Sequence, residues 1–185
     1  KAENLCQFVF AEAVCNHTIT QRWAVETEFV ETAIEADLMP ASAYNKEQSA
    51  TSRVSSILSF VKICPKEGKV HLPVTYREDL LTIYSNLPIE REYLKPLSHS
   101  IPSATTVKNS RNEMAGLLRQ VVEQVGEDFP SYLTEEPDVF QLMLPLDLAN
   151  IDFAVEQARA KGFFLGGLLP VWTGTDTLMM QRLKL

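Results

Sequence analysis

The sequence predicts an α+β protein in which one order of elements, strand, helix, strand, strand, occurs twice. Short apolar runs rich in β-favouring residues lie near both ends of the chain, and each is followed by a helical pattern. The two regions also share letters at an offset of 130 residues. Val-Phe occurs at 9–10 and at 139–140, and Ala-Val-Glu occurs at 24–26 and at 154–156. The common order and letters together indicate an internal duplication.

The first unit is expected over residues 1–65. Its run FVFAEAVC is short and apolar, which predicts a mostly buried strand over 8–15. Thr18 and Gln21 fit a capping box, so a helix is expected to follow over 19–28. Two further strands are predicted, over 29–36 and 53–63.

Residues 66–95 are expected to form a connector with a helix over 75–87. Thr75 and Glu78 fit a second capping box at the start of this helix. The helix carries an apolar stripe at helical spacing, formed by Leu80, Ile83, Tyr84 and Leu87.

The second unit is expected over 96–185. A buried strand is predicted within DVFQLMLPLD, followed by a helix with one apolar face. That face consists of Ile151, Ala154, Val155 and Ala158. The final apolar run, broken by glycine, proline and Thr-Gly, predicts two antiparallel strands over 163–172 and 176–185. The region from 105 to 125 is ambiguous: its first half indicates a strand, and its second half is either the returning strand or a helix.

Composition restricts the function classes. The net charge of −7 argues against a protein that follows the phosphates of a nucleic acid. No run approaches the roughly 20 apolar residues of a membrane span. The cysteines Cys6, Cys15 and Cys64 are too dispersed to predict a metal site, and we expect reduced thiols in a cytoplasmic protein.

Four segments together resemble the C-terminal half of a GNAT-type acyl-CoA N-acyltransferase. They are AEAVCNHTITQ, EFVETAIEADLMPAS, VHLPVTYREDLLTIYSNL and GFFLGGLLP with TDTLMMQRL. The chain is most similar to the tandem GNAT-like regions that in bacteria sometimes follow a kinase-like ATPase domain. The resemblance implies a GNAT-like mixed sheet with flanking helices, acetyl-CoA as cosubstrate, and a small-molecule amine or a protein as acyl acceptor.

The resemblance also implies a site at the end of the first predicted strand. In a GNAT fold the sheet splays, and the acyl-pantetheine arm lies in the gap beside a strand end. Here that strand end carries Asn16, a candidate pantetheine contact, and His17, the candidate catalytic acid or base. Gln21, on the following helix, is a second candidate pantetheine contact. The alternative is a polar cluster that only terminates the strand.

The sequence departs from the family at the pyrophosphate site. GNAT enzymes hold the coenzyme A pyrophosphate in a Q/R-x-x-G-x-G/A turn, where backbone amides meet the phosphates. This sequence has no such turn. We therefore expect the pyrophosphate loop to lie in an upstream domain of the same polypeptide, and the second unit to be a degenerate copy.

Two functions remain open at this point. The chain is expected to be part of an acyl-CoA-dependent N-acetyltransferase, or a non-catalytic GNAT-like sensor or interaction module that regulates an attached domain. Trp23 and Phe29 are expected in the core. The glutamates of the first unit are expected on a solvated acidic face or, alternatively, around a mouth that attracts a cationic amine; they are Glu12, Glu26, Glu31 and Glu35.

Overall fold

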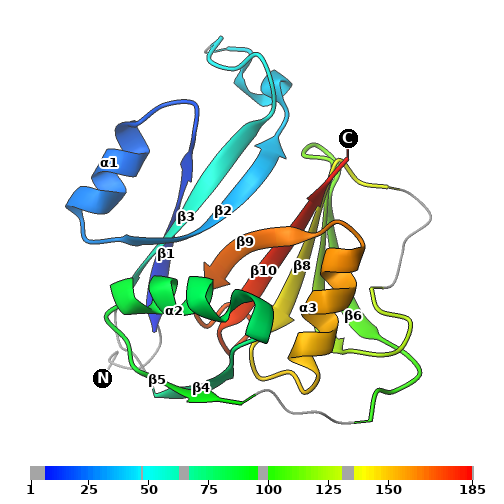
Figure 1. The fold of residues 1–185 in the computed structure, drawn as a ribbon. Coiled ribbons are helices and arrows are strands. Elements are labelled where there is room, and N and C mark those ends of the chain that lie inside the picture. The colour runs from blue at the N-terminus through cyan, green and yellow to red at the C-terminus, as the bar shows by residue number, and fades with distance from the viewer. Residues whose placement is uncertain (1–6, 47, 63–66, 96–99, 131–135, 185) are drawn as a thin grey trace, which may run out of the picture.

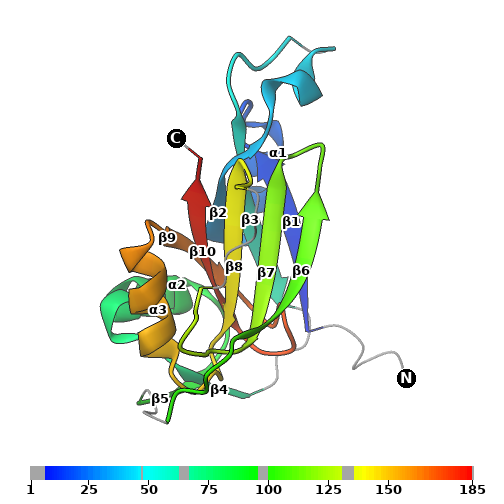
Figure 2. The ribbon, with the colours of Figure 1, turned by 90° about the vertical axis from the view of Figure 1, so that its right-hand side faces the viewer.

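The computed structural model describes residues 7–46, 48–62, 67–95, 100–130 and 136–184. It is an α+β structure with one large curled sheet and few helices (Figures 1 and 2). The α+β class predicted from the sequence is therefore confirmed.

The first unit has the predicted order of elements. A short 3-10 helix, Ala41–Tyr44, lies between its last two strands. Its strands and helix are β1 (Phe8–Val14), α1 (Ile19–Glu26), β2 (Val30–Met39) and β3 (Val54–Lys62).

The connector contains the predicted helix and two short strands. The helix begins as a 3-10 turn, Val74–Tyr76, and continues as α2 (Arg77–Asn86). The strands β4 (Gly68–His71) and β5 (Arg91–Leu94) pair in parallel as a small separate sheet.

The ambiguous region is a strand pair, and the second unit then repeats the order of the first. The strand pair is β6 (Thr106–Asn112) and β7 (Leu117–Gln124). The following elements are β8 (Val139–Pro145), α3 (Ile151–Ala160), β9 (Phe164–Leu169) and β10 (Thr177–Leu183).

The eight strands of the large sheet are ordered β1-β3-β2-β9-β10-β8-β7-β6. In the first unit β3 lies between β1 and β2, and in the second unit β10 lies between β9 and β8. The last strand of each unit is thus its central one. All neighbouring pairs are antiparallel except β7 and β8, which are parallel. The two units meet where β2 pairs with β9, so equivalent strands face each other at this junction.

The junction depends on glycine. Ala33 of β2 pairs with Gly167 of β9, and this is the one residue pair of their ladder within the described residues. Gly167 has φ +136°, and a Cβ atom there would lie 2.3 Å from the Thr32 carbonyl oxygen. Next to this pair, the Gln181 side chain donates to the Ile34 carbonyl (2.7 Å) and accepts from the Ala36 amide (2.9 Å). The Gln181 amide thus takes the place of a strand backbone beside β2.

Apolar side chains cover both faces of the sheet. On the outer face, α2 and α3 pack against β7, β8, β9 and β10, and the predicted apolar face of α3 is fully buried there. On the inner face, side chains from β3, β8, β9 and β10 form a second cluster, with Trp172 packed against it. The strands of the second unit are therefore packed on both faces.

Candidate functional site

The parallel strands β7 and β8 separate before either of them ends. Their ladder runs from Leu117 opposite Val139 to Val121 opposite Met143. Beyond that point β7 remains paired with β6 as far as Gln124, and β8 remains paired with β10 as far as Pro145. The sheet therefore opens between two strands that each keep their outer partner.

Pro145 explains why the ladder stops. In a parallel ladder every second residue of a strand donates to the same neighbour. The Val139 amide donates to the Gly116 carbonyl (3.1 Å), so this alternation places later donors of β8 at 141, 143 and 145. Proline has no N–H, so position 145 cannot donate to the carbonyl of Val122 on β7.

An irregularity in β7 adds to the separation. The register with β6 shifts so that Val122 lies opposite Val107 while Gln124 lies opposite Thr106, which leaves Glu123 as an extra residue. A bulge of this kind bends its strand locally. The proline and the bulge together turn the two strand ends away from each other.

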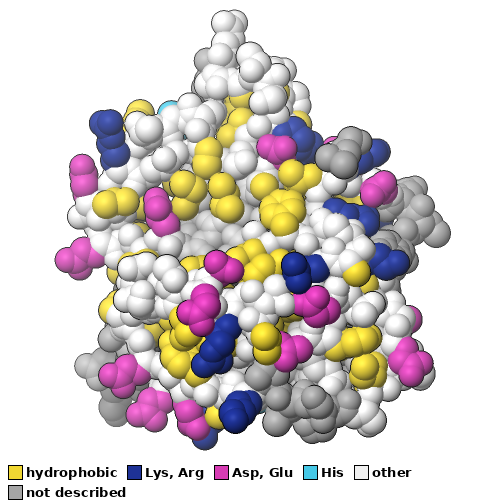
Figure 3. Space-filling model, viewed as in Figure 1, with side chains coloured by type: hydrophobic (Ala, Val, Ile, Leu, Met, Phe, Trp, Pro, Cys, Tyr) yellow, Lys and Arg dark blue, Asp and Glu magenta, His cyan; other side chains and the backbone are white. Residues whose placement is uncertain are grey.

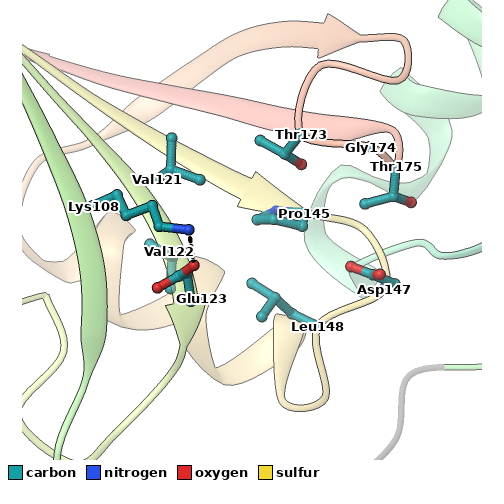
Figure 4. Close-up of a pocket in the computed structure, with 10 residues that line it drawn as sticks. All are labelled: Lys108, Val121, Val122, Glu123, Pro145, Asp147, Leu148, Thr173, Gly174 and Thr175. Carbon is teal, nitrogen blue, oxygen red and sulfur yellow. Dashed lines mark ion pairs between the residues drawn. The ribbon is translucent and has the colours of Figure 1, made fainter.

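A pocket of about 450 Å³ occupies the opening (Figure 4). It is bounded by the end of β7, the residues after β8, and the loop between β9 and β10. Its lining residues are Lys108, Val121, Val122, Glu123, Pro145, Asp147, Leu148, Thr173, Gly174 and Thr175. A second pocket of about 360 Å³ shares Glu123 and Leu148 and continues the hollow toward Asn150 at the start of α3.

The charges around the first pocket are mixed, with an acidic excess. Lys108 is its one cation among the lining residues described, and its Nζ lies 2.5 Å from the Glu123 carboxylate in an exposed ion pair (Figure 4). Asp147 adds a second carboxylate. These side chains favour an uncharged or cationic group more than a polyphosphate.

The predicted site residues lie together near the end of β1, where the side chains of Asn16 and Gln21 form hydrogen bonds with neighbouring loop and backbone groups. Gln21 Nε2 donates to the carbonyls of Val14 (3.0 Å) and His17 (2.8 Å), which closes the turn between β1 and α1. Asn16 Nδ2 donates to Ser49 Oγ (2.9 Å), while the buried Asn16 Oδ1 has no hydrogen-bond partner among the residues that the structure describes. The His17 side chain is exposed. The predicted capping box is wrong, because Thr18 makes no side-chain cap hydrogen bond.

The end of β1 and the pocket lie at opposite ends of the sheet. Five successive antiparallel pairings separate β1 from β8, so the two strands run in opposite directions. In addition, β1 is an edge strand of the described sheet and has no parallel neighbour from which to splay. The structure therefore does not bring Asn16, His17 and Gln21 to the pocket.

The sequence predicts Glu35 on a solvated acidic face or around an acidic mouth, but in the structure its side chain is buried. It is only 2% exposed and accepts hydrogen bonds from Gln141 Nε2 and Arg119 Nη2, both at 2.9 Å. Burial raises the pKa of Glu35, and these two donors only partly offset the effect. Because the donors lie on β7 and β8, Glu35 links the first unit to the strands that form the pocket.

Other predicted features can be located only in part. Cys15 is a free, exposed thiol, whereas Cys6 and Cys64 lie outside the described residues. Within the described ranges, no group of three or more His, Cys, Asp or Glu side chains could hold a metal ion. Every helix in the same ranges is too short or too polar to reach across a lipid bilayer.

Comparisons with models of protein families, with curated proteins and with solved structures find no match to this chain.

One sequence signal could have indicated the pocket. Pro145 interrupts the apolar run DVFQLMLPLD, and a proline inside a central strand marks a position where a ladder hydrogen bond is missing. At the offset of 130 residues, Asn16 and His17 correspond to Leu146 and Asp147. The sequence prediction concerned the equivalent strand end of the first unit.

Proposed function

We propose that the chain is part of a GNAT-like, acyl-CoA-dependent N-acetyltransferase, and that the pocket between β7 and β8 receives the acyl-pantetheine arm. The observation that carries this proposal is the early end of the β7–β8 ladder at Pro145. It leaves the Val122 carbonyl without its ladder donor beside a pocket that is open along the strand. A pantetheine arm is extended and contains amide groups, so it can pair with such a strand as an additional strand would.

The order of strands supports the same proposal. Strand, helix, strand, strand, with the last strand in the middle, occurs in both units, as the GNAT resemblance leads one to expect. In the second unit this arrangement is preceded by β7, which lies parallel to β8 and then diverges from it. Acetyl-CoA bound here would supply an acyl group activated as a thioester.

The pocket fits the arm of acetyl-CoA but not its phosphates. Lys108 is the one cation among its described lining residues, and this ammonium is already paired with Glu123. Gly174 is the one glycine among the described lining residues, so this lining lacks the glycine-rich turn in which backbone amides surround a pyrophosphate. We propose that an upstream part of the polypeptide supplies the phosphate site. The carboxylates of Glu123 and Asp147 would attract a cationic amine as acyl acceptor.

The missing phosphate site also favours a second candidate function. A GNAT-like sensor or interaction module could bind a pantetheine-like amide ligand in this pocket without transferring an acyl group. The predicted catalytic group His17 lies at the other end of the sheet, which agrees with this alternative. Release of free thiol from acetyl-CoA in the presence of amines distinguishes the two: the enzyme turns over, and the module binds without turnover.

We expect residues 1–185 to bind acetyl-CoA and S-acetylpantetheine weakly and about equally, because the phosphates gain no charge-assisted contacts in this pocket.

Pro145→Ala supplies the missing N–H and allows the ladder to extend toward Val122. It should weaken binding of both ligands about fivefold, the equivalent of about 1 kcal/mol. Isothermal titration calorimetry measures all of these affinities.

Pro137→Ala is the matched control, since this proline precedes β8 and lies outside the opening. It should leave both affinities unchanged. Micromolar binding of acetyl-CoA with much weaker binding of S-acetylpantetheine would contradict the proposed phosphate-free site. Equal affinities of the wild type and Pro145→Ala would show that the opening is not where the ligand binds.

A further inference from the structure

One wall of the pocket is a loop that residues of the connector (66–95) contact through hydrogen bonds. This wall segment, residues 170–176, joins β9 to β10 and contributes Thr173, Gly174 and Thr175 to the pocket. Two of its residues have positive φ, +53° at Val171 and +92° at Gly174. A non-glycine residue in that conformation requires support from its surroundings.

The support comes from Asp176, whose carboxylate accepts hydrogen bonds from three directions. Arg91 of β5 donates from Nε to Oδ2 (2.7 Å) and from Nη2 to Oδ1 (3.2 Å). The Tyr84 hydroxyl of α2 donates to Oδ2 (2.8 Å). The Val171 amide, at the other end of the wall segment, donates to Oδ1 (3.0 Å). The carboxylate thus closes the wall segment on itself and ties it to the connector.

Asp176, Arg91 and Tyr84 together form a clamp on the wall segment, and this clamp is buried. The Arg91 and Asp176 side chains are 3% and 1% exposed. Burial lowers the pKa of Arg91, but the hydrogen bonds and charge of Asp176 outweigh it, and the pKa is raised. Burial, reinforced by Asp176, also raises the pKa of Tyr84, so the phenol remains a donor. Removing one partner leaves the other buried charge uncompensated.

We propose that Arg91 and Tyr84 are positioning residues for the pocket, which hold the wall segment in place through Asp176. The inference rests on the proposed function, since it assigns the connector the role of shaping that same pocket. The connector, which contributes none of the described lining residues, thereby controls the width of the pocket.

Trp172 provides a readout that needs no ligand. It lies within the wall segment, and its ring packs against Phe10 at 5.1 Å and Phe60 at 6.3 Å between centroids. The chain has two tryptophans, and the other, Trp23, is exposed on α1. In a Trp23→Phe background, fluorescence therefore reports the wall segment alone.

The test compares Arg91→Ala, Arg91→Lys and Tyr84→Phe in that background, with Glu92→Gln as control. Glu92 is the neighbour of Arg91 on β5 and forms an exposed ion pair with Lys69 (2.9 Å). Arg91→Ala should shift Trp172 emission to the red, increase its quenching by acrylamide, and weaken S-acetylpantetheine binding about tenfold, because charge-assisted bonds are lost. Arg91→Lys should restore part of each effect, and Glu92→Gln should change nothing.

Far-ultraviolet circular dichroism checks that each variant is folded. If Arg91→Ala does not fold, Arg91→Lys and Tyr84→Phe decide the question, and Tyr84→Phe should change both readouts in the same direction but less. Unchanged emission and quenching in the folded variants would overturn the inference, as would a binding loss without any change at Trp172. If the wild type does not bind S-acetylpantetheine, the proposed function fails, and the fluorescence alone decides whether the clamp positions the wall.

Discussion

Gly167→Ala is expected to destabilise the protein by about 3–5 kcal/mol, since a Cβ atom would overlap the backbone of β2. In a chain of this length that lowers the melting temperature by about 10 °C. The change acts at the junction of the two units, where Ala33 opposite Gly167 is the described backbone pair. Displacement of β2 would also strain the contacts of Gln181 and Glu35. Thermal unfolding followed by circular dichroism measures the effect.

Gly162→Ala is the matched control for this substitution. Gly162 also has positive φ, +83°, but the nearest atom to an added Cβ is the Arg182 Cδ at 3.8 Å. Gly162→Ala should therefore lower the free energy of unfolding only by the conformational cost of positive φ, about 1–2 kcal/mol. Equal losses for the two variants would mean that β2 is not held closely against β9.

Leu168→Ala should cost about 2–5 kcal/mol, the usual effect of truncating a buried leucine. Leu168 is fully buried among side chains of α2, α3 and the neighbouring strands. The total stability of a domain is about 5–15 kcal/mol, so the melting temperature should fall by several degrees. Ligand binding by the folded fraction should not change, since Leu168 does not line the pocket.

Phe164→Ala on the same strand should cost clearly less, because Phe164 is partly exposed. If Leu168→Ala left the melting curve unchanged, the C-terminal run would be an exposed apolar surface, better interpreted as a docking site.

The sequence predicted most strands and helices, because their apolar periodicity is a local property. Helix α3 shows this best: its four predicted face residues are all buried. The short strand β5 was missed, since REYL carries two charges and lies among prolines. Both capping boxes were wrong. Thr75 donates instead to the Glu156 carboxylate of α3, a tertiary contact that no local pattern can predict.

Burial in the first unit was predicted less well. Trp23 was expected in the core but is 53% exposed. Phe10 is 50% exposed, whereas its counterpart Phe140 is 2% exposed. Phe140 packs in the cluster beneath α2 and α3, and its ring centroid lies 5.1 Å from that of Phe163. Phe10 lies on β1, an edge strand of the described sheet. Equal sequence patterns therefore led to unequal burial, since burial depends on which elements pack against each strand.

The candidate site proposed from the structure lies at a different position from the site predicted from the sequence. A splayed strand pair was expected, and the position chosen was the end of β1. The opening instead lies between β7 and β8, where Pro145 and the bulge at Glu123 end the ladder. The clamp on Asp176 had no sequence signal, because Tyr84, Arg91 and Asp176 belong to three separate elements.

The most direct test of the proposed site is a nuclear magnetic resonance titration of residues 1–185, labelled with ¹⁵N, with S-acetylpantetheine. We predict saturable shifts of the amide signals of Val122, Glu123 and Asp147, which line the opening, and a dissociation constant about fivefold larger in Pro145→Ala. Shifts confined to Asn16, His17 and Gln21, or no saturable shift at all, would contradict it.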